Sequence, residues 1–248
     1  MNIIRTTKPY YSLYDLIFKE INPTEEEIKE GYLLYRDCGM KAHVISKKGN
    51  IPIENVSFED LRIPSIELAI KPLSLYKNKG FDHIRDRAKD SLERLIDAEV
   101  FKLLGCAVKN ESIIKSYLCH VTSETFNFLI GHIESHDLPT GIFILNPITY
   151  RQIELRLNVH DKQKDTYVGK YNNIPIYTSV MCQPNVIFLV AQKEYVGVLV
   201  NYGLEENKII ELAENTSDLE ESKCGFEIIK SLGFAVVNDY AVAKIICT

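Results

Sequence analysis

The segment from residue 41 to residue 73 constrains the fold most strongly, because it has the pattern of extended chain but no partner strand close to it in sequence. Apolar residues at Ile66, Leu68 and Ile70 alternate with polar or small ones, which is typical of a strand. Three prolines interrupt the segment, and a proline cannot donate to a sheet ladder. A stretch this long without a place in a core is usually functional or disordered. We therefore predict a projecting two-stranded arm.

The residues after this segment predict the longest helix of the chain, over about 83–104. Asp82 is a suitable N-cap and Gly105 a natural stop, while Leu92 and Ile96 belong to an apolar face at helical spacing. Acidic residues along the helix are interleaved with Arg and Lys, so we interpret them as a solvated or subunit-contacting surface. These acidic residues are Asp82, Asp86, Asp90, Glu93 and Asp97.

The N-terminal 23 residues predict an arm with a short amphipathic piece that ends at Asn22-Pro23. The sequence Thr24 to Glu27 then forms a capping box, in which the threonine hydroxyl and the glutamate carboxylate can each satisfy an amide of the first turn. A helix over about 25–37 is expected, with Gly39 as its stop.

The middle of the chain contains a clear step from strand to helix. The apolar run 141–145 predicts a buried strand, and Asn146-Pro147 places an N-cap directly before a proline at the first helical position. Another helix is expected over about 123–135, with Ser123 as its cap.

The last third of the chain predicts strands. Three of them are expected at 174–177, 186–190 and 195–200. Acidic, loop-like sequence follows over 204–223, and the end predicts a β-hairpin in which 226–237 pairs with 240–247 around a turn at Asn238-Asp239. Helices and strands are not regularly alternated, so the fold class is α+β.

Composition excludes several classes of protein. The hydrophobic fraction of 46% is enough for a substantial core, and the net charge of -5 argues against a protein that coats nucleic acid. No apolar run is long enough for a signal peptide or a membrane span, so no membrane partner is expected. The six cysteines have no zinc-like spacing and are expected to be free, mostly buried thiols.

The sequence contains only weak signals for catalytic or metal-binding sites. Cys119-His120 is the strongest candidate for a catalytic pair, because a thiol nucleophile needs a nearby imidazole. Adjacent side chains cannot easily face each other, however, so a buried thiol and a surface imidazole are the better interpretation. His132 and His136 have metal-like i, i+4 spacing but lack the glutamate of the HExxH motif, which favours ordinary surface or helix-end histidines. Glycine-rich phosphate loops are absent from the sequence. We expect no enzyme, no cofactor and no metal site.

The order of these elements, together with two sequence patterns, resembles the Hong Kong 97-type capsid fold of tailed bacteriophages and of the related encapsulin nanocompartments. The patterns are 143–147, a strand that enters Asn-Pro, and the closing stretch 233–243. The resemblance implies a division into 1–40 as N-terminal arm and short helix, 41–75 as the extended E-loop, 76–112 and 206–248 as the peripheral (P) domain with the long spine helix, and 113–205 as the axial (A) domain.

The function implied by this resemblance is that of a major capsid protein. Its chief partner would be itself, in pentamers and hexamers of an icosahedral shell that encloses double-stranded viral DNA without sequence-specific binding. A separate scaffolding protein, a portal and decoration proteins are implied as further partners, with assembly in the host cytoplasm and final location in the virion. The alternatives are an encapsulin-type shell and, more remotely, a soluble α+β enzyme with Cys119 as its nucleophile.

The same resemblance assigns assembly roles to particular residues. The E-loop residues expected at subunit contacts are Lys47, Lys48, Ile51, Ile66, Leu68 and Ile70. The basic residues expected on the spine helix are Arg85, Arg87 and Arg94.

Overall fold

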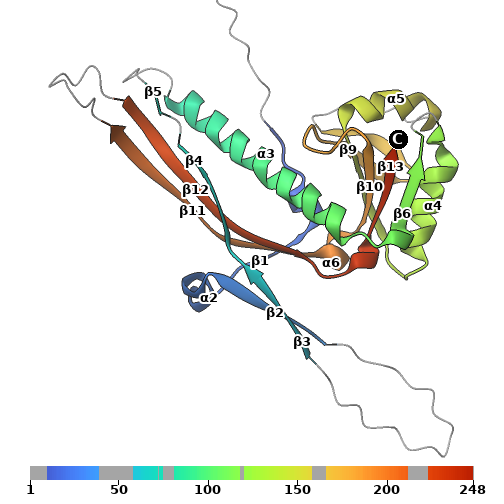
Figure 1. Cartoon of the computed structure of the whole chain (residues 1–248), viewed down its shortest axis with the longest axis horizontal. Helices are drawn as coiled ribbons and strands as arrows, with labels where there is room; N and C mark the ends of the chain where they lie inside the picture. Colours follow the sequence, from blue (N-terminus) through green and yellow to red (C-terminus); the bar gives the residue numbers. More distant parts are fainter. Residues whose placement is uncertain are drawn as a thin grey trace, which may run out of the picture.

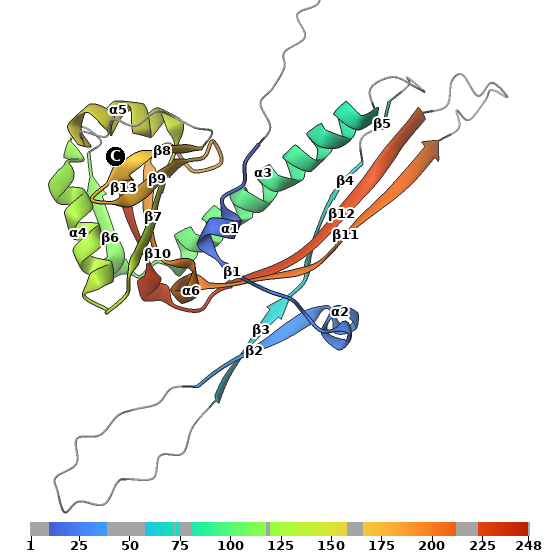
Figure 2. The same ribbon diagram turned by 180° about the vertical axis from the view of Figure 1, so that it is seen from behind.

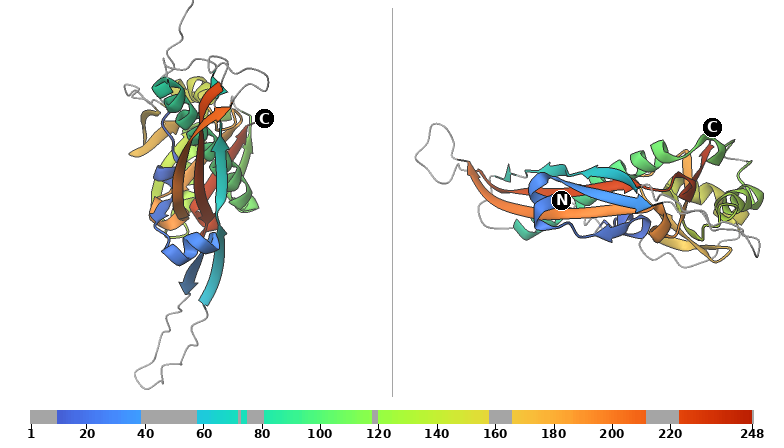
Figure 3. Two further views of the ribbon diagram at one scale, coloured as in Figure 1. Left: turned by 90° about the vertical axis from the view of Figure 1, so that its left-hand side faces the viewer. Right: turned by 90° about the horizontal axis from the view of Figure 1, so that it is seen from below.

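The computed structural model describes residues 10–38, 58–71, 73–74, 81–117, 120–157, 166–211 and 223–247. Over these ranges the chain forms two sheets joined by a long helix, and a narrow two-stranded arm projects from the region where the sheets meet (Figure 1). The body is elongated and slender in side view, with the arm extending away from it (Figure 3). The predicted α+β class is confirmed.

The long helix α3 spans Phe81–Ala107 and connects the two sheets. Its buried stripe repeats at a spacing of four residues through Ala88, Leu92, Ile96, Val100 and Leu104. The outer half of the stripe packs on the first sheet, and the inner half joins the core of the second. The predicted helix is therefore confirmed, although it begins before Asp82 and continues past Gly105.

The first sheet has five strands and is dominated by two long ones, β11 (Gly197–Glu211) and β12 (Lys223–Val236), which pair antiparallel along their whole length. The short strand β1 (Lys19–Ile21) runs parallel to β11 at one edge. At the other edge, β4 (Ile66–Ile70) and β5 (Leu73–Ser74) pair with β12. Figure 2 shows α3 lying along this sheet.

The second sheet has six strands in the order β6-β13-β10-β7-β9-β8. Their bounds are β6 Ile113–Ser116, β7 Thr140–Leu145, β8 Tyr167–Tyr171, β9 Ile174–Thr178, β10 Val186–Ala191 and β13 Val242–Cys247. Helices α4 (Ser123–Glu134) and α5 (Pro147–Leu157) lie beside this sheet (Figure 1). The central strand β10 is buried throughout, as its continuous apolar sequence requires.

The strand-to-helix step after β7 forms as predicted. The side-chain oxygen of Asn146 accepts a hydrogen bond from the Ile148 amide at 2.9 Å, and its Nδ2 donates to the Cys182 carbonyl oxygen at 2.8 Å. Pro147 occupies the first helical position, where no backbone donor is needed.

The prediction of a helix over 25–37 is wrong beyond its first turns. Helix α2 covers only Glu25–Glu30, and strand β2 (Tyr32–Cys38) follows it and pairs with β3 (Phe58–Pro64). The stop is Gly31, not Gly39, because Gly31 adopts a left-handed φ of 71° and its amide bonds back to Glu27 and Ile28. The capping box at Thr24 and Glu27 is present as predicted.

The predicted C-terminal hairpin is also wrong. Strand β12 pairs with β11 of the first sheet, whereas β13 enters the second sheet beside β10. A short 3-10 turn, η4 (Asp239–Ala241), carries the chain between the sheets. Residues 242–247 therefore lie in the second sheet, apart from β12. The strands also extend into the predicted acidic loop as far as Glu211 and from Lys223.

Candidate assembly surfaces

The arm leaves the body at a tightly packed clamp. Leu33 of β2 and Ile63 of β3 lie opposite each other, are both buried, and form a small core with Val198 and Val200 of β11. The Tyr202 hydroxyl donates to the Ile63 carbonyl oxygen at 2.9 Å. The base of the arm is thus fixed by packing and by a hydrogen bond.

Gly233 of β12 permits the close crossing of the arm over the sheet. A Cβ at this position would lie 2.9 Å from the Pro64 carbonyl oxygen and 3.0 Å from side-chain atoms of Ile63 and Tyr202. Backbone therefore approaches backbone here at a distance that only glycine allows.

Beyond the clamp, the arm exposes leucines on both of its faces. Leu61 lies opposite Tyr35 on the same face as the clamp residues, and 39% of it is exposed. Leu34 lies on the reverse face opposite Arg62, and 43% of it is exposed. A two-stranded ribbon is marginal by itself in water, and this one offers apolar side chains in both directions. The arm therefore has the character of a docking element.

The residues predicted for the arm fall in different places. Lys47, Lys48 and Ile51 lie outside the described residues. The segment 66–70 is not part of the projecting arm, because it forms β4 and pairs with β12 of its own chain.

Strand β4 contributes to the core of its own subunit. Leu68 and Ile70 pack on the cluster of Ala88, Leu92 and Ile228, while Ile66 is 40% exposed. Of the three apolar residues assigned to subunit contacts in this strand, only Ile66 presents a largely exposed side chain.

The N-terminal segment is tied to the spine helix through Asp97. This fully buried carboxylate accepts hydrogen bonds from the Leu13 amide at 3.0 and 3.1 Å and from the Tyr10 hydroxyl at 2.5 Å. Burial raises the pKa of Asp97 to about 6, and the hydrogen bonds from Tyr10 and Leu13 limit the rise. The interpretation of Asp97 as part of a solvated face is therefore wrong.

A second tie involves Lys230 of β12. Its ammonium group donates to Glu93 Oε1 of the spine helix at 2.7 Å and to the Tyr14 hydroxyl at 2.8 Å. Glu93 Oε2 is buried without a hydrogen-bond partner among the described residues. Burial, with the neighbouring Glu93 carboxylate, raises the pKa of Tyr14. Helix α1 (Tyr14–Ile17) is thereby held between the spine helix and β12.

The basic residues of the spine helix have different partners. Arg85 forms an ion pair with Glu206 of β11 at 2.7 Å, and the Arg94 guanidinium lies 4.7 Å from the centroid of the Tyr10 ring. Arg87 is exposed, and its carbonyl oxygen accepts a hydrogen bond from the Ser91 hydroxyl. Two of the three predicted residues thus brace the subunit internally.

The described residues offer little catalytic chemistry. Cys119 lies outside them, and His120 is exposed beside the Tyr117 ring. Burial raises the pKa of the Cys182 thiol to about 12, which leaves it protonated and unreactive. Within the described ranges, no group of three His, Cys, Asp or Glu side chains could hold a metal ion, and no helix is long and apolar enough to cross a membrane.

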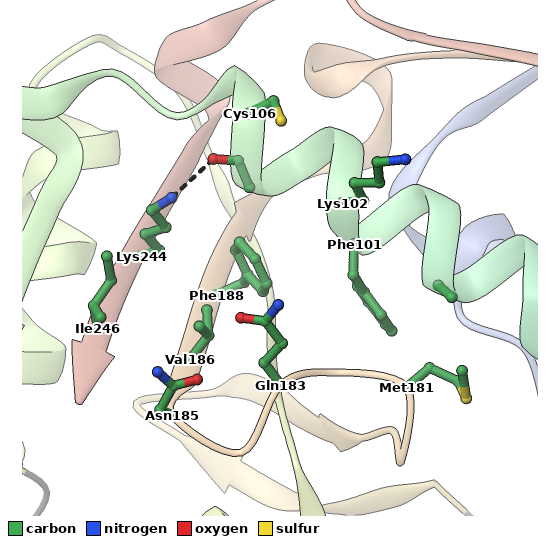
Figure 4. A pocket seen from close by; sticks show the side chains of 12 residues that line it. Phe101, Lys102, Cys106, Met181, Gln183, Asn185, Val186, Phe188, Lys244 and Ile246 are labelled. Atoms are coloured by element: carbon green, nitrogen blue, oxygen red, sulfur yellow. Dashed lines mark hydrogen bonds between the residues drawn. The ribbon is translucent and has the colours of Figure 1, made fainter. Parts of the chain in front are cut away.

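A cavity of about 370 Å³ opens between α3 and strands β10 and β13 (Figure 4). Its walls combine apolar side chains such as Phe101 and Phe188 with Lys244, whose ammonium group donates to the Gly105 carbonyl oxygen at 2.8 Å. The exposed Cys106 lies at its edge. This lining couples the spine helix to the second sheet.

Comparison with known proteins is informative only at the level of structure. No family profile matches the chain, and no curated protein sequence matches it. A chain from Microbacterium phage Oxtober96 matches with a TM-score of 0.75 at 11% identity, covering 100% of this chain and 95% of that one. A chain of the cyanophage P-SCSP1u capsid matches with a TM-score of 0.68 at 10% identity, covering 99% and 91%.

An encapsulin is similar as well. A chain of the holo-SrpI encapsulin complex from Synechococcus elongatus PCC 7942 matches with a TM-score of 0.60 at 11% identity, covering 98% of this chain and 92% of that one. These matches span essentially the whole chain, so the predicted Hong Kong 97-type capsid fold is confirmed.

Proposed function

We propose that this chain is the structural subunit of a closed protein shell. The observation that carries the proposal is the clamped two-stranded arm, which projects from a body of capsid-type fold and exposes leucines on both faces. Covering an exposed apolar side chain such as Leu61 with another surface lowers the free energy, because it removes apolar area from water. A neighbouring copy of the same chain supplies that surface at every position of a symmetric shell.

The parts of the subunit take the following roles in this proposal. The ribbon of β2 and β3 is the E-loop, the first sheet with α3 is the P domain, and the second sheet with α4 and α5 is the A domain. Stable assemblies need a large area of contact between copies. The arm adds to the contact area that the slender body can offer. Pentamers and hexamers of the subunit then close the shell.

Substitution of Leu61 tests the role of the arm. We expect Leu61→Lys to leave the melting temperature of the isolated subunit within a few degrees, because the side chain is already 39% exposed, but to abolish particles. Leu61→Met keeps an apolar side chain of similar volume and should assemble as wild type does. Light scattering after size-exclusion chromatography gives the measurement. Normal particles from the lysine variant would refute the role of the arm.

The contents of the shell are proposed to be double-stranded viral DNA. The phage chains among the similar structures support this choice. The net charge of -5 also agrees with it, because a strongly basic wall would bind the DNA phosphates and release their counterions, whereas an acidic wall would not. A separate scaffolding protein, a portal and decoration proteins would complete the particle, which assembles in the host cytoplasm and becomes part of the virion.

The second candidate is an encapsulin-type compartment, which the similarity to the SrpI chain favours. Particles purified from the native source separate the two functions. Nuclease-protected DNA supports the viral shell, whereas nucleic-acid-free particles with a co-purifying cargo enzyme support the compartment.

A further inference from the structure

The chain passes between its two sheets at three connections within the described residues. The first is 108–112, which joins α3 to β6 and includes the 3-10 turn η1 (Asn110–Ser112). The second is α6 (Lys193–Val196), between β10 and β11, and the third is 237–241, between β12 and β13. Any change in the angle between the two sheets must therefore act on these three connections.

Contacts of the third connection join all three together. Asp239 forms an ion pair with Lys109 of the first connection at 3.0 Å. The amides of Val237 and Asn238 both donate to the Val196 carbonyl oxygen of the second connection, at 2.9 and 3.2 Å. The turn η4 is thus the meeting point of the connections, as its position beside α6 in Figure 1 indicates.

Two histidines of α4 and its end fasten this meeting point to the second sheet. The His136 ring stacks on Tyr240 of η4 with 4.1 Å between ring centroids. The His132 Nε2 atom lies 2.7 Å from the hydroxyl of Ser112, which is buried in η1. The centroids of the two imidazoles are 5.1 Å apart. This arrangement explains the i, i+4 spacing of the histidines without a metal.

We propose that His132 and His136 form an acid-sensitive staple, which holds the two sheets at a fixed angle near neutral pH and releases them in mild acid. The inference stands on these contacts and does not depend on the proposed function.

Charged groups from both neighbouring connections surround the staple. Lys109, whose ammonium group lies 3.6 Å from the centroid of the Tyr240 ring, brings one positive charge, and Asp239 and Glu111 bring two negative ones. The two imidazoles face each other across 5.1 Å, and the charge of His136 disfavours a positive charge on His132.

The direction of the pH effect follows from His132. Burial, and secondly the charge of the neighbouring His136, lowers the pKa of His132 below its ordinary value of 6.5. A lowered histidine pKa contributes stability that is present above 6.5 and is lost as the pH falls through that value. Acid therefore weakens the staple.

Hydrogen exchange measured by mass spectrometry on the full chain tests the staple, in buffer with a chelator and after correction for intrinsic exchange rates. Between about pH 7.5 and about pH 5.5 we expect protection of peptides covering 108–113 and 236–242 to fall about tenfold. Peptides covering 10–17 report separately on the titration of Asp97. Unchanged protection of the two connections in wild type would overturn the proposal.

Variants decide whether the histidines cause the response. His136→Phe keeps an aromatic ring against Tyr240 but removes one of the two imidazoles, so its connections should lose only part of the pH response, because the buried His132 remains. The double variant His132→Gln with His136→Gln should lose the pH response even if it is looser at both pH values. The matched control is His120→Gln, an exposed histidine that precedes α4 in the chain, which should respond as wild type does. A wild-type response in the double variant would assign the pH response to other groups and overturn the proposal.

Discussion

At the scale of single residues, buried polar groups hold the N-terminal segment on the spine helix. Asp97 occupies an apolar stripe of the spine helix, where an isolated carboxylate would be strongly unfavourable. The Leu13 amide and the Tyr10 hydroxyl offset that cost and fix the start of the described chain on the helix. The same logic applies to Lys230, which is held by Glu93 and Tyr14.

The pH dependence of Asp97 gives a testable result. Its pKa is raised from 3.8 to about 6 in the folded chain, so the stability it contributes is present at low pH and is lost as the pH rises through about 6. The loss is about 3 kcal/mol when the carboxylate is fully ionised. Asp97→Asn lacks this ionisation and still offers an acceptor to the Leu13 amide.

Urea unfolding of both proteins measures the effect. The free energy of unfolding of Asp97→Asn relative to wild type should increase by about 2.5 kcal/mol between about pH 4 and about pH 7.5. A difference that stays constant, or that decreases as the pH rises, would show that the carboxylate is not desolvated in the folded chain.

The crossing at Gly233 provides a prediction that does not depend on pH, because only the space around this residue matters. Gly233→Ala forces a Cβ within 2.9 Å of the Pro64 carbonyl oxygen and should destabilise the subunit by about 1–3 kcal/mol. Gly131→Ala is the matched control, because a Cβ added to this helical glycine would have no neighbouring atom within 4 Å, and the change should stabilise by about 0.5–1 kcal/mol. Thermal unfolding followed by circular dichroism measures both. Equal melting temperatures for the two variants would contradict the clamp.

At the scale of elements, the arm and strand β4 have separate roles although they are adjacent in sequence. The ribbon of β2 and β3 projects, whereas β4 pairs with β12 and packs on the spine helix. The Ser65 amide, which donates to the Gly31 carbonyl oxygen at 2.8 Å, lies at the boundary between the two roles.

Two replacements distinguish these roles. Opposed residues of neighbouring strands are about 5 Å apart, so a short Gly-Ser linker can replace 36–60 and still close the clamp. We expect this variant to fold as a subunit and to form no particles. Replacing 41–73 also removes β4 and should lower the melting temperature strongly, because Leu68 and Ile70 are lost from the core. Equal stability of the two variants would place β4 outside the core.

Local signals in the sequence were sufficient for some elements and insufficient for others. The apolar stripe of α3 and the Asn146-Pro147 step could be predicted because each is defined by neighbouring residues. The pairing of β12 with β11, and of β13 with β10, joins segments whose partners no local pattern specifies. Helix α2 has no buried side chain, so the spacing of apolar residues could not indicate that the helix ends at Gly31.

The burial of Asp97 and its hydrogen bonds to the N-terminal segment could not be predicted, for a related reason. An acidic residue at regular spacing among other charges has the pattern of a solvated face, and only the N-terminal segment folded onto the helix buries it. The one available signal is its position directly after the buried Ile96 and three residues before the buried Val100. The fold class and the long helix, by contrast, were predicted correctly.

At the scale of the whole molecule, the proposed shell accounts for the apolar side chains that the arm leaves exposed. The subunit's body is slender, its arm extends beyond it, and Leu34 and Leu61 on the arm are partly exposed (Figures 1 and 3). Closed symmetric assembly satisfies these surfaces in every copy with one set of contacts.

Assembly into a shell is tested most directly by negative-stain electron microscopy of the purified full-length chain, combined with light scattering on the same sample. We predict closed, roughly spherical particles of uniform size, formed by the chain alone or with a scaffolding protein from its native source. A monomer that persists under all of these conditions, at concentrations where the subunit is folded, would contradict the proposed shell.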